Sequence, residues 1–279
     1  MKVGILAATG KSIGLGHLTR CLSIAISLRQ LSHNIEFILE NEYFSNWIHE
    51  SGFSIRYSNQ LMHKYDLIIV DKYDIDKKFL QTAKTWCNLL ARVDDAYSLF
   101  DDKITDIIIN CNPYAKEDLY EGIVRQDSHL ILGAEYVPMD SKFCRLRNEY
   151  RLKNTIENIT LTFGGSQNID FVKRVCERIQ TKNYYTNIFV LNGTKLKDSL
   201  RNTAALNLKL LPLISNIEEV LSVSDLVVCA ASTTCWQLCA SGIPFICFKT
   251  ADNQKHNYDY IKNSKVGIAL ENTAIHDGT

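Results

Sequence analysis

Short apolar runs alternate with helical patterns along the first half of the chain. The run at residues 2–8 predicts a strand, and residues 17–31 predict a helix because apolar residues recur there on one helical face. The continuous apolar run at 66–70 is typical of a strand buried on both faces of a parallel sheet. Similar runs predict further strands at residues 35–39, 54–57, 89–93 and 107–110, with a short helix at 43–50.

The second half repeats this alternation after a polar, basic-rich stretch at 140–154, which predicts a helix and a linker. Asn216 is expected to cap a short helix that ends near Val223. Further strands are expected at residues 158–163, 188–191, 208–211, 225–230 and 245–248. The repeated alternation predicts an α/β protein of two Rossmann-like domains, residues 1–145 and 146–279, whose parallel sheets flank a cleft.

A glycine turn at residues 13–16 joins the first predicted strand to the first predicted helix. Gly14 and Gly16 permit positive φ angles and close approach of a ligand, and the N–H groups of the helical turn that follows favour an anion such as phosphate. His17 comes next, and a histidine can act as acid, base or hydrogen-bond donor near neutral pH. The alternative is a tight turn with a histidine near a helix start.

Two segments of the second half also join a predicted strand to a predicted helix and could bind phosphate. Gly165 and Ser166 follow one predicted strand, while Ser232, Thr233 and Thr234 follow another. Small hydroxyl residues there place side-chain and backbone donors at one helix N-terminus, which suits a diphosphate. The alternative interpretation is that these residues are ordinary helix caps.

Composition excludes several classes of function. Lys+Arg and Asp+Glu are 31 each, so we expect no nucleic acid as a partner. No apolar run approaches the roughly 20 residues of a membrane span, so no membrane insertion is expected, and the absence of a signal-peptide pattern predicts a cytoplasmic protein. Nine cysteines without a Cys-x-x-Cys pair fit neither a disulfide framework nor a zinc site. No acidic cluster suits a metal ion, and no cofactor is expected.

Five motifs, in order along the chain, resemble the UDP-sugar hydrolases of the pseudaminic acid pathway, the PseG type. They lie at residues 13–21, 71–73, 110–122, 133–136 and 162–165. Residues 216–253 are also similar to the nucleotide-binding domain of GT-B glycosyltransferases, notably the one that adds N-acetylglucosamine in peptidoglycan synthesis. The resemblance implies a GT-B fold and metal-independent removal of UDP from a UDP-2,4-diacetamido-2,4,6-trideoxyhexose.

The resemblance also implies roles for individual residues. His17 matches the family's catalytic histidine, Tyr73 its site tyrosine, and Asn253 an asparagine near the sugar. The nucleotide is expected on the second domain and the glycine turns, at Gly14, Gly16, Gly165, Ser166, Ile214, Ser232, Thr233, Thr234 and Gln237. Ile214 lies where the uracil base is expected, and Gln237 where related sequences usually place a glutamate that holds the ribose.

Three functions therefore stay open at the level of sequence. The first is an inverting hydrolase in nonulosonic acid biosynthesis. The second is a GT-B glycosyltransferase with a UDP-amino-sugar donor, in which an acceptor hydroxyl replaces water. The third is a non-catalytic nucleotide-sugar-binding module, suggested by Gln237 and by Ala7-Ala8-Thr9, which stands where a charged pair commonly follows the first strand. The exact sugar and the oligomeric state are open as well.

Overall fold

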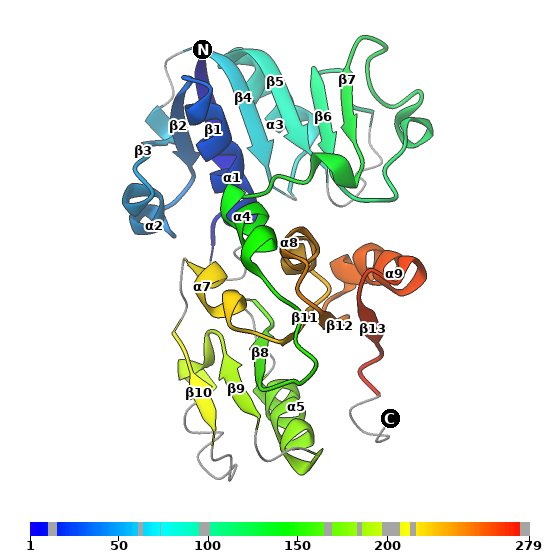
Figure 1. The fold of residues 1–279 in the computed structure, drawn as a ribbon. Coiled ribbons are helices and arrows are strands. Elements are labelled where there is room, and N and C mark those ends of the chain that lie inside the picture. Colours follow the sequence, from blue (N-terminus) through cyan, green and yellow to red (C-terminus); the bar gives the residue numbers. More distant parts are fainter. Residues whose placement is uncertain are drawn as a thin grey trace. The chain divides into compact units, whose positions relative to one another are not determined.

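The chain forms two compact units, Met1–Asp140 and Ser141–Thr279, each built around one parallel sheet (Figure 1). The computed structural model describes residues 1–10, 16–60, 64–72, 74–94, 101–164, 169–182, 186–196, 207–212 and 216–273. The predicted fold class, α/β with two parallel sheets, is confirmed. The division precedes the expected boundary at residue 145, because helix α4 (Ser141–Glu149) contacts α7 and α8 of the second unit.

The sheet of the first unit has the order β3-β2-β1-β4-β5-β6-β7, and neighbouring strands pair in parallel. The strands are β1 (Lys2–Ala7), β2 (Asn34–Leu39), β3 (Ser54–Tyr57), β4 (Tyr65–Asp71), β5 (Cys87–Val93), β6 (Ile107–Asn110) and β7 (His129–Leu132). The strand order reverses between β1 and β4. Ligands of open α/β sheets bind beyond the carboxyl ends of the strands at such a switch point.

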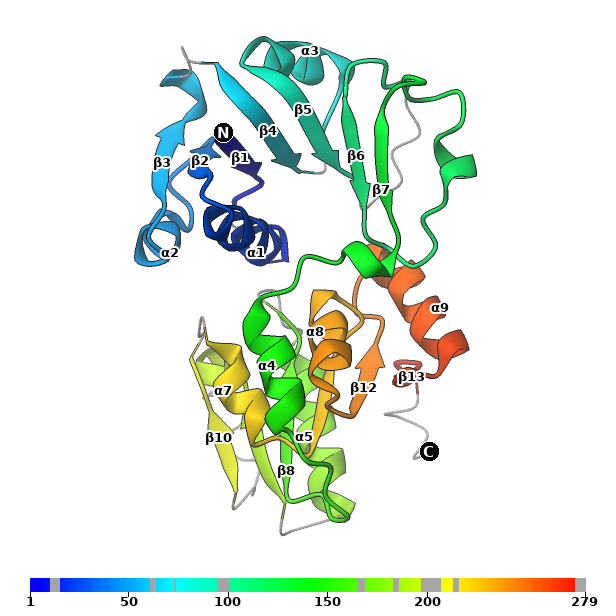
Figure 2. The same cartoon turned by 45° about the horizontal axis from the view of Figure 1, so that its top comes forward.

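Helices cover both faces of this sheet (Figure 2). They are α1 (Gly16–Gln30), α2 (Ser45–Glu50) and α3 (Lys77–Thr85), with single 3-10 turns at Ser58–Gln60, Glu117–Tyr120 and Ala134–Tyr136. Ile5 of β1 belongs to the core that α1 buries, whereas Leu6 belongs to the core that α3 buries. Because successive strand residues point to opposite faces, β1 is buried on both sides, as is common for a central strand of a parallel sheet.

The second unit has the sheet order β10-β9-β8-β11-β12-β13, again with parallel pairs. Its strands are β8 (Asn158–Thr162), β9 (Asn187–Val190), β10 (Leu208–Leu210), β11 (Leu226–Ala230), β12 (Phe245–Phe248) and β13 (Ile268–Leu270). Its helices besides α4 are α5 (Ile169–Lys182), α7 (Ile217–Ser222), α8 (Thr233–Ser241) and α9 (Lys255–Ser264), with 3-10 turns at Gly193–Leu196 and Asp252–Gln254. Here the order reverses between β8 and β11. Among the described helices, none could cross a membrane.

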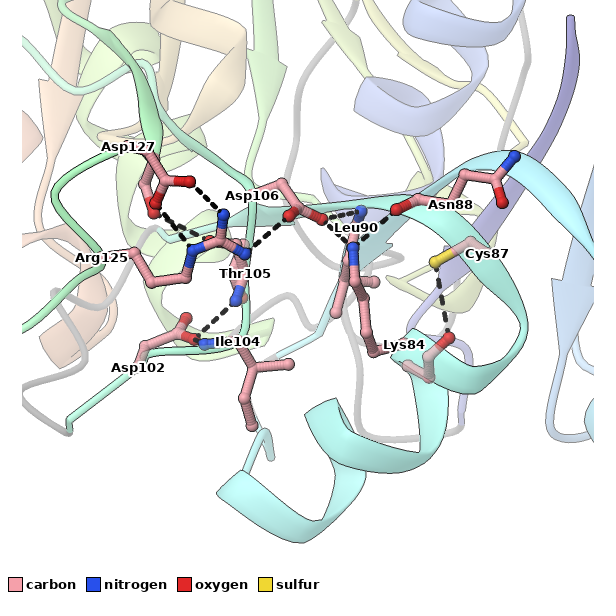
Figure 3. Close-up of polar contacts among 12 residues, drawn as sticks. Lys84, Cys87, Asn88, Leu90, Asp102, Ile104, Thr105, Asp106, Arg125 and Asp127 are labelled. Carbon is pink, nitrogen blue, oxygen red and sulfur yellow. Dashed lines mark hydrogen bonds and ion pairs between the residues drawn. The ribbon is translucent and has the colours of Figure 1, made fainter.

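A charged cluster ties the first sheet together at the amino-terminal end of β6 (Figure 3). Asp106, which precedes β6, accepts hydrogen bonds from the Lys84 ammonium, from the Leu90 amide at 2.7 Å and from Arg125 Nη1 at 2.9 Å. Arg125 also contacts Asp127 through Nε at 2.8 Å. This cluster lies at the edge opposite to the carboxyl ends of the strands, so its role is to hold neighbouring segments in place.

Candidate active site

His17 and Asp71 meet at the switch point of the first sheet. His17 is the second residue of α1, and Asp71 is the last residue of β4. Their Nδ1 and Oδ1 atoms are 2.6 Å apart, and the residues are 5% and 0% exposed. Because a carboxylate only accepts hydrogen bonds, Nδ1 carries the proton, and Nε2 of the neutral ring then carries the lone pair. This tautomer can accept a proton at Nε2.

Asp71 receives donors from one face of α1. Arg20 binds it with both arms of its guanidinium, Nε to Oδ2 at 2.8 Å and Nη2 to Oδ1 at 2.7 Å, and Cys21 Sγ lies 3.4 Å from Oδ2. Burial favours the neutral acid, but the charge of Arg20 and the hydrogen bonds from His17 and Arg20 outweigh burial and hold the pKa of Asp71 well below its usual range. Asp71 is therefore a carboxylate at neutral pH.

The segment that leaves β1 is fixed from the neighbouring strand. Asn41, two residues beyond β2, accepts a hydrogen bond from Thr9 Oγ1 at 3.0 Å and donates one to the Thr9 carbonyl at 2.9 Å. The amide of Ala8 donates to the Asp71 carbonyl at 2.8 Å. These bonds hold Ala8 and Thr9 beside the carboxyl end of β4.

A second polar network lies at the carboxyl ends of β5 and β6. Arg92, 1% exposed, places Nη1 3.3 Å from Asp94 Oδ1 and Nε 3.0 Å from Asp102 Oδ2. The Tyr120 hydroxyl donates to Asp94 Oδ2 at 3.0 Å and accepts from Asn110 Nδ2 at 2.8 Å. Burial, reinforced by the charge of Asp94, raises the pKa of Tyr120, so this group stays a phenol. The network is buried and links the carboxyl ends of β5 and β6 to the segment that carries Tyr120.

In the second unit, helix α8 begins at the carboxyl end of β11, next to the reversal of strand order. Ser232 is its N-cap residue in an extended conformation, and its side chain makes no capping hydrogen bond. Thr233 and Thr234 follow in the first turn, and both are half-buried. Gln237, also half-buried, lies one turn after Thr233 and so on the same helical face. The Cys235 amide donates to the Ser232 carbonyl at 2.9 Å, so the backbone N–H groups of Thr233 and Thr234 are the ones that suit an anion here.

The predicted site residues divide into three groups. His17 and Gly16 lie at the start of α1, and the four α8 residues lie together in the second unit. Asn253 is in the 3-10 turn Asp252–Gln254, with its side chain outside the described part. Five predicted residues lie outside the described residues: Gly14, Tyr73, Gly165, Ser166 and Ile214. Asn216 precedes α7 as expected, although its side chain makes no capping hydrogen bond.

Sequence reasoning assigned no role to Asp71 or Arg20. Two signals could have found them. Asp71 directly follows the apolar run of a buried strand, and Arg20 is three residues after His17, on the same face of the helix. Within the described ranges, no group of three or more His, Cys, Asp or Glu residues could hold a metal ion.

Comparison with known proteins agrees with this architecture. Residues 159–277 match the Glycosyltransferase family 28 C-terminal domain. An uncharacterised protein of Methanocaldococcus jannaschii is 26% identical over 94% of this chain. The match covers only 58% of that relative's own length. The UDP-2,4-diacetamido-2,4,6-trideoxy-beta-L-altropyranose hydrolase of Campylobacter jejuni is 30% identical over 55% of this chain and 57% of its own.

Glycosyltransferases are similar over a longer stretch, at lower identity. The UDP-N-acetylglucosamine–N-acetylmuramyl-(pentapeptide) pyrophosphoryl-undecaprenol N-acetylglucosamine transferase of Campylobacter fetus is 21% identical over 97% of this chain and 88% of its own. Among solved structures, Acinetobacter baumannii MurG has a TM-score of 0.64 at 14% identity, covering 98% of this chain and 86% of MurG. Anabaena HepE in complex with UDP and glucose has a TM-score of 0.60 at 14% identity, and the match covers 100% of this chain and 90% of HepE. The chain therefore has the GT-B glycosyltransferase fold, and its second half matches the C-terminal domain of glycosyltransferase family 28.

Proposed function

We propose that this protein is a metal-independent, inverting hydrolase that removes UDP from a UDP-2,4-diacetamido-2,4,6-trideoxyhexose in nonulosonic acid biosynthesis. The observation that carries the proposal is the 2.6 Å contact between His17 Nδ1 and Asp71 Oδ1 at the switch point of the first sheet. It gives the chain a histidine whose Nε2 can accept a proton. The partial similarity to a hydrolase of this substrate class and the family 28 domain support the choice of reaction and of nucleotide.

In this reaction water attacks the anomeric carbon while UDP leaves. The new bond joins the water oxygen to C1, and the bond from C1 to the diphosphate oxygen breaks with its electron pair going to UDP. The proton of the attacking water passes to Nε2 of His17, whose ring Asp71 holds in place. A positioned base of this kind contributes roughly a hundred- to ten-thousand-fold in rate. Tyr73 and Asn253 complete the sugar side of the proposed site.

The leaving group requires positive electrostatic potential and hydrogen-bond donors. We assign the diphosphate to the first turn of α8, at Ser232, Thr233 and Thr234, because this helix N-terminus lies directly after the carboxyl end of β11. The ribose is assigned to Gln237 and the uracil to the backbone at Ile214. The two glycine turns, with Gly14, Gly16, Gly165 and Ser166, complete the nucleotide side.

A glycosyltransferase is the second candidate function. It is favoured by similarity to the Campylobacter fetus transferase over 97% of this chain, a longer stretch than the hydrolase match. In that case His17 would take its proton from an acceptor hydroxyl and not from water. The geometry of His17 and Asp71 serves both reactions, so the acceptor decides between them.

One experiment separates the candidates. The purified chain is incubated with a panel of UDP-linked diacetamido sugars, with and without EDTA, and released UDP and the product anomer are measured by chromatography and NMR. A hydrolase releases UDP without any acceptor, with inverted configuration and undiminished by EDTA. Release only after a sugar or lipid-linked acceptor is added identifies a transferase. Binding of UDP without turnover under either condition identifies a binding module and refutes both enzymatic proposals.

A further inference from the structure

We propose that Arg20 is a positioning residue that keeps His17 in its neutral, proton-accepting form; this inference rests on the proposed function of the same site. Arg20 and His17 share one carboxylate oxygen. Oδ1 of Asp71 lies 2.7 Å from Arg20 Nη2 and 2.6 Å from His17 Nδ1, while Oδ2 lies 2.8 Å from Arg20 Nε. One buried acceptor therefore serves two groups that can each carry positive charge.

The charge of Asp71 determines which of them must be a cation. A carboxylate that is 0% exposed needs a positive partner, because burying it alone is costly. If His17 were the sole partner, the imidazolium form would be favoured, and a protonated ring cannot take a proton from water. Arg20 is always charged and binds both oxygens in a planar fork, so it supplies that partner itself. The cluster is then electrically neutral when His17 is neutral.

Arg20 also acts on the ring directly. Its Nη2 atom lies 3.4 Å from His17 Nδ1, so protonation of the ring would place a second positive charge beside the guanidinium. Like charges at this distance disfavour the charged form. Arg20 therefore disfavours the protonated ring in two ways, by neutralising Asp71 and by repelling an imidazolium.

The local sequence explains why these groups converge. His17, Arg20 and Cys21 are spaced at i, i+3 and i+4 on the first turns of α1, so they lie on one helical face. The titratable or charged groups that face the ring of His17 include Arg20 and Cys21 from α1 and Asp71 from β4. Cys21 Sγ lies 3.4 Å from Asp71 Oδ2 and brings no charge as a thiol.

The test is a titration of the histidine ring protons by NMR in the ligand-free protein. The His17 signal is assigned by its absence from His17→Asn. Removing the guanidinium in Arg20→Gln should raise the midpoint of the His17 signal by about one to two pH units. Arg20→Lys keeps a charge but loses the fork, so its upward shift should be smaller. In both variants the acid limb of the rate profile should move with the midpoint, so that activity returns at higher pH.

Arg29→Gln is the matched control. Arg29 lies in the last turn of the same helix, where Nη1 is 3.3 Å from the carbonyls of Ser51 and Gly52, and its loss should leave the His17 midpoint unchanged. Asp71→Asn should shift the midpoint of the His17 signal in the opposite direction. It leaves the charge of Arg20 unopposed beside the ring, so the midpoint should fall. The six other histidine signals report whether each variant keeps its fold.

Opposite shifts in Arg20→Gln and Asp71→Asn support the proposal. An unchanged or lowered midpoint in Arg20→Gln overturns it; if that variant does not fold, an unchanged or lowered midpoint in Arg20→Lys overturns it. The titration needs no substrate, so its outcome is independent of the hydrolase assignment. A wild-type chain that releases UDP while Arg20→Gln shows no shift refutes the role of Arg20 alone. A chain that releases no UDP refutes the hydrolase.

Discussion

The Nδ1 atom of His17 and the Oδ1 atom of Asp71 lie 2.6 Å apart, with both residues buried. This contact joins the helix that follows the glycine turn to the end of a central strand. It fixes the ring at the edge where ligands of open α/β sheets bind. Changes at this pair should therefore alter the rate of the reaction more than the affinity for nucleotide.

Replacing His17 by alanine tests the base directly. We expect a loss of about a hundred- to ten-thousand-fold in kcat, because water loses its proton acceptor. UDP affinity, measured by calorimetry, should change little, since the base, ribose and diphosphate are assigned to the second unit and the His17 side chain is assigned to the attacking water. His17→Asn, which still donates a hydrogen bond, should retain more activity than His17→Ala. Hydrolysis by His17→Ala at the wild-type rate would remove the catalytic assignment and leave a structural residue.

The pH profile should have one acid limb. A base acts only when neutral, so kcat/KM should fall about tenfold per pH unit below the midpoint of the histidine. Asp71 adds no second limb, because Arg20 and His17 hold its pKa well below the assay range. The measurement is kcat/KM from pH 5 to 9 with UDP release as readout. A limb with a slope of two, or none at all, would contradict a single histidine base.

Asp71→Asn should also lower the free energy of unfolding, in a pH-dependent way. At pH 7 the change leaves Arg20 without its carboxylate, which costs roughly 3 kcal/mol. The pKa of Asp71 is lower in the folded chain than in the unfolded chain, where it is about 3.9. The ionised carboxylate therefore stabilises the fold fully above pH 3.9, and this stabilisation is lost as the pH falls through the folded-state pKa. In urea titrations, the gap between wild type and variant should therefore narrow below pH 4. A gap that widens on acidification would be inconsistent with an ionised, paired Asp71.

Much of the fold was predictable because strong local patterns decide it. The apolar run at 66–70 correctly indicated a buried central strand, which in the structure is β4 (Tyr65–Asp71). Strand β7 (His129–Leu132) was not predicted, since it is a four-residue edge strand with only partial burial and thus a weak pattern. Short edge strands depend on pairing with a neighbour, which local sequence does not encode.

The candidate site was predictable only in part, for a related reason. The glycine turn and helix start identified His17 as a candidate from adjacent residues. Its partner Asp71 is 54 positions away, and the two meet because β1 and β4 pair in parallel, with Ala7 opposite Asp71. The role of Arg20 depends on that long-range pairing too. A local pattern therefore finds the histidine but not the charges that control it.

Gln237 offers the sharpest test of the proposed nucleotide site. It is half-buried and lies on α8 one turn after Thr233, on the same face of the helix as that first-turn residue. A carboxylate there would accept charge-assisted hydrogen bonds from ribose hydroxyls, which are stronger than those to an amide. The UDP dissociation constant of Gln237→Glu, measured by calorimetry, should therefore be unchanged or up to about tenfold lower, as one stronger hydrogen bond allows.

The control for this substitution is Gln81→Glu, which makes the same change at an exposed position of α3 in the first unit and should leave UDP affinity as it is. A Gln237→Glu variant that binds UDP more than about tenfold more weakly, while Gln81→Glu does not, would place this face of α8 against the diphosphate, where like charges repel. Binding of another nucleotide in preference to UDP by the wild-type chain would refute the uridine assignment itself. Improved affinity in Gln237→Glu, with no change in Gln81→Glu, supports a ribose contact, because a neighbouring hydroxyl gains from the added charge.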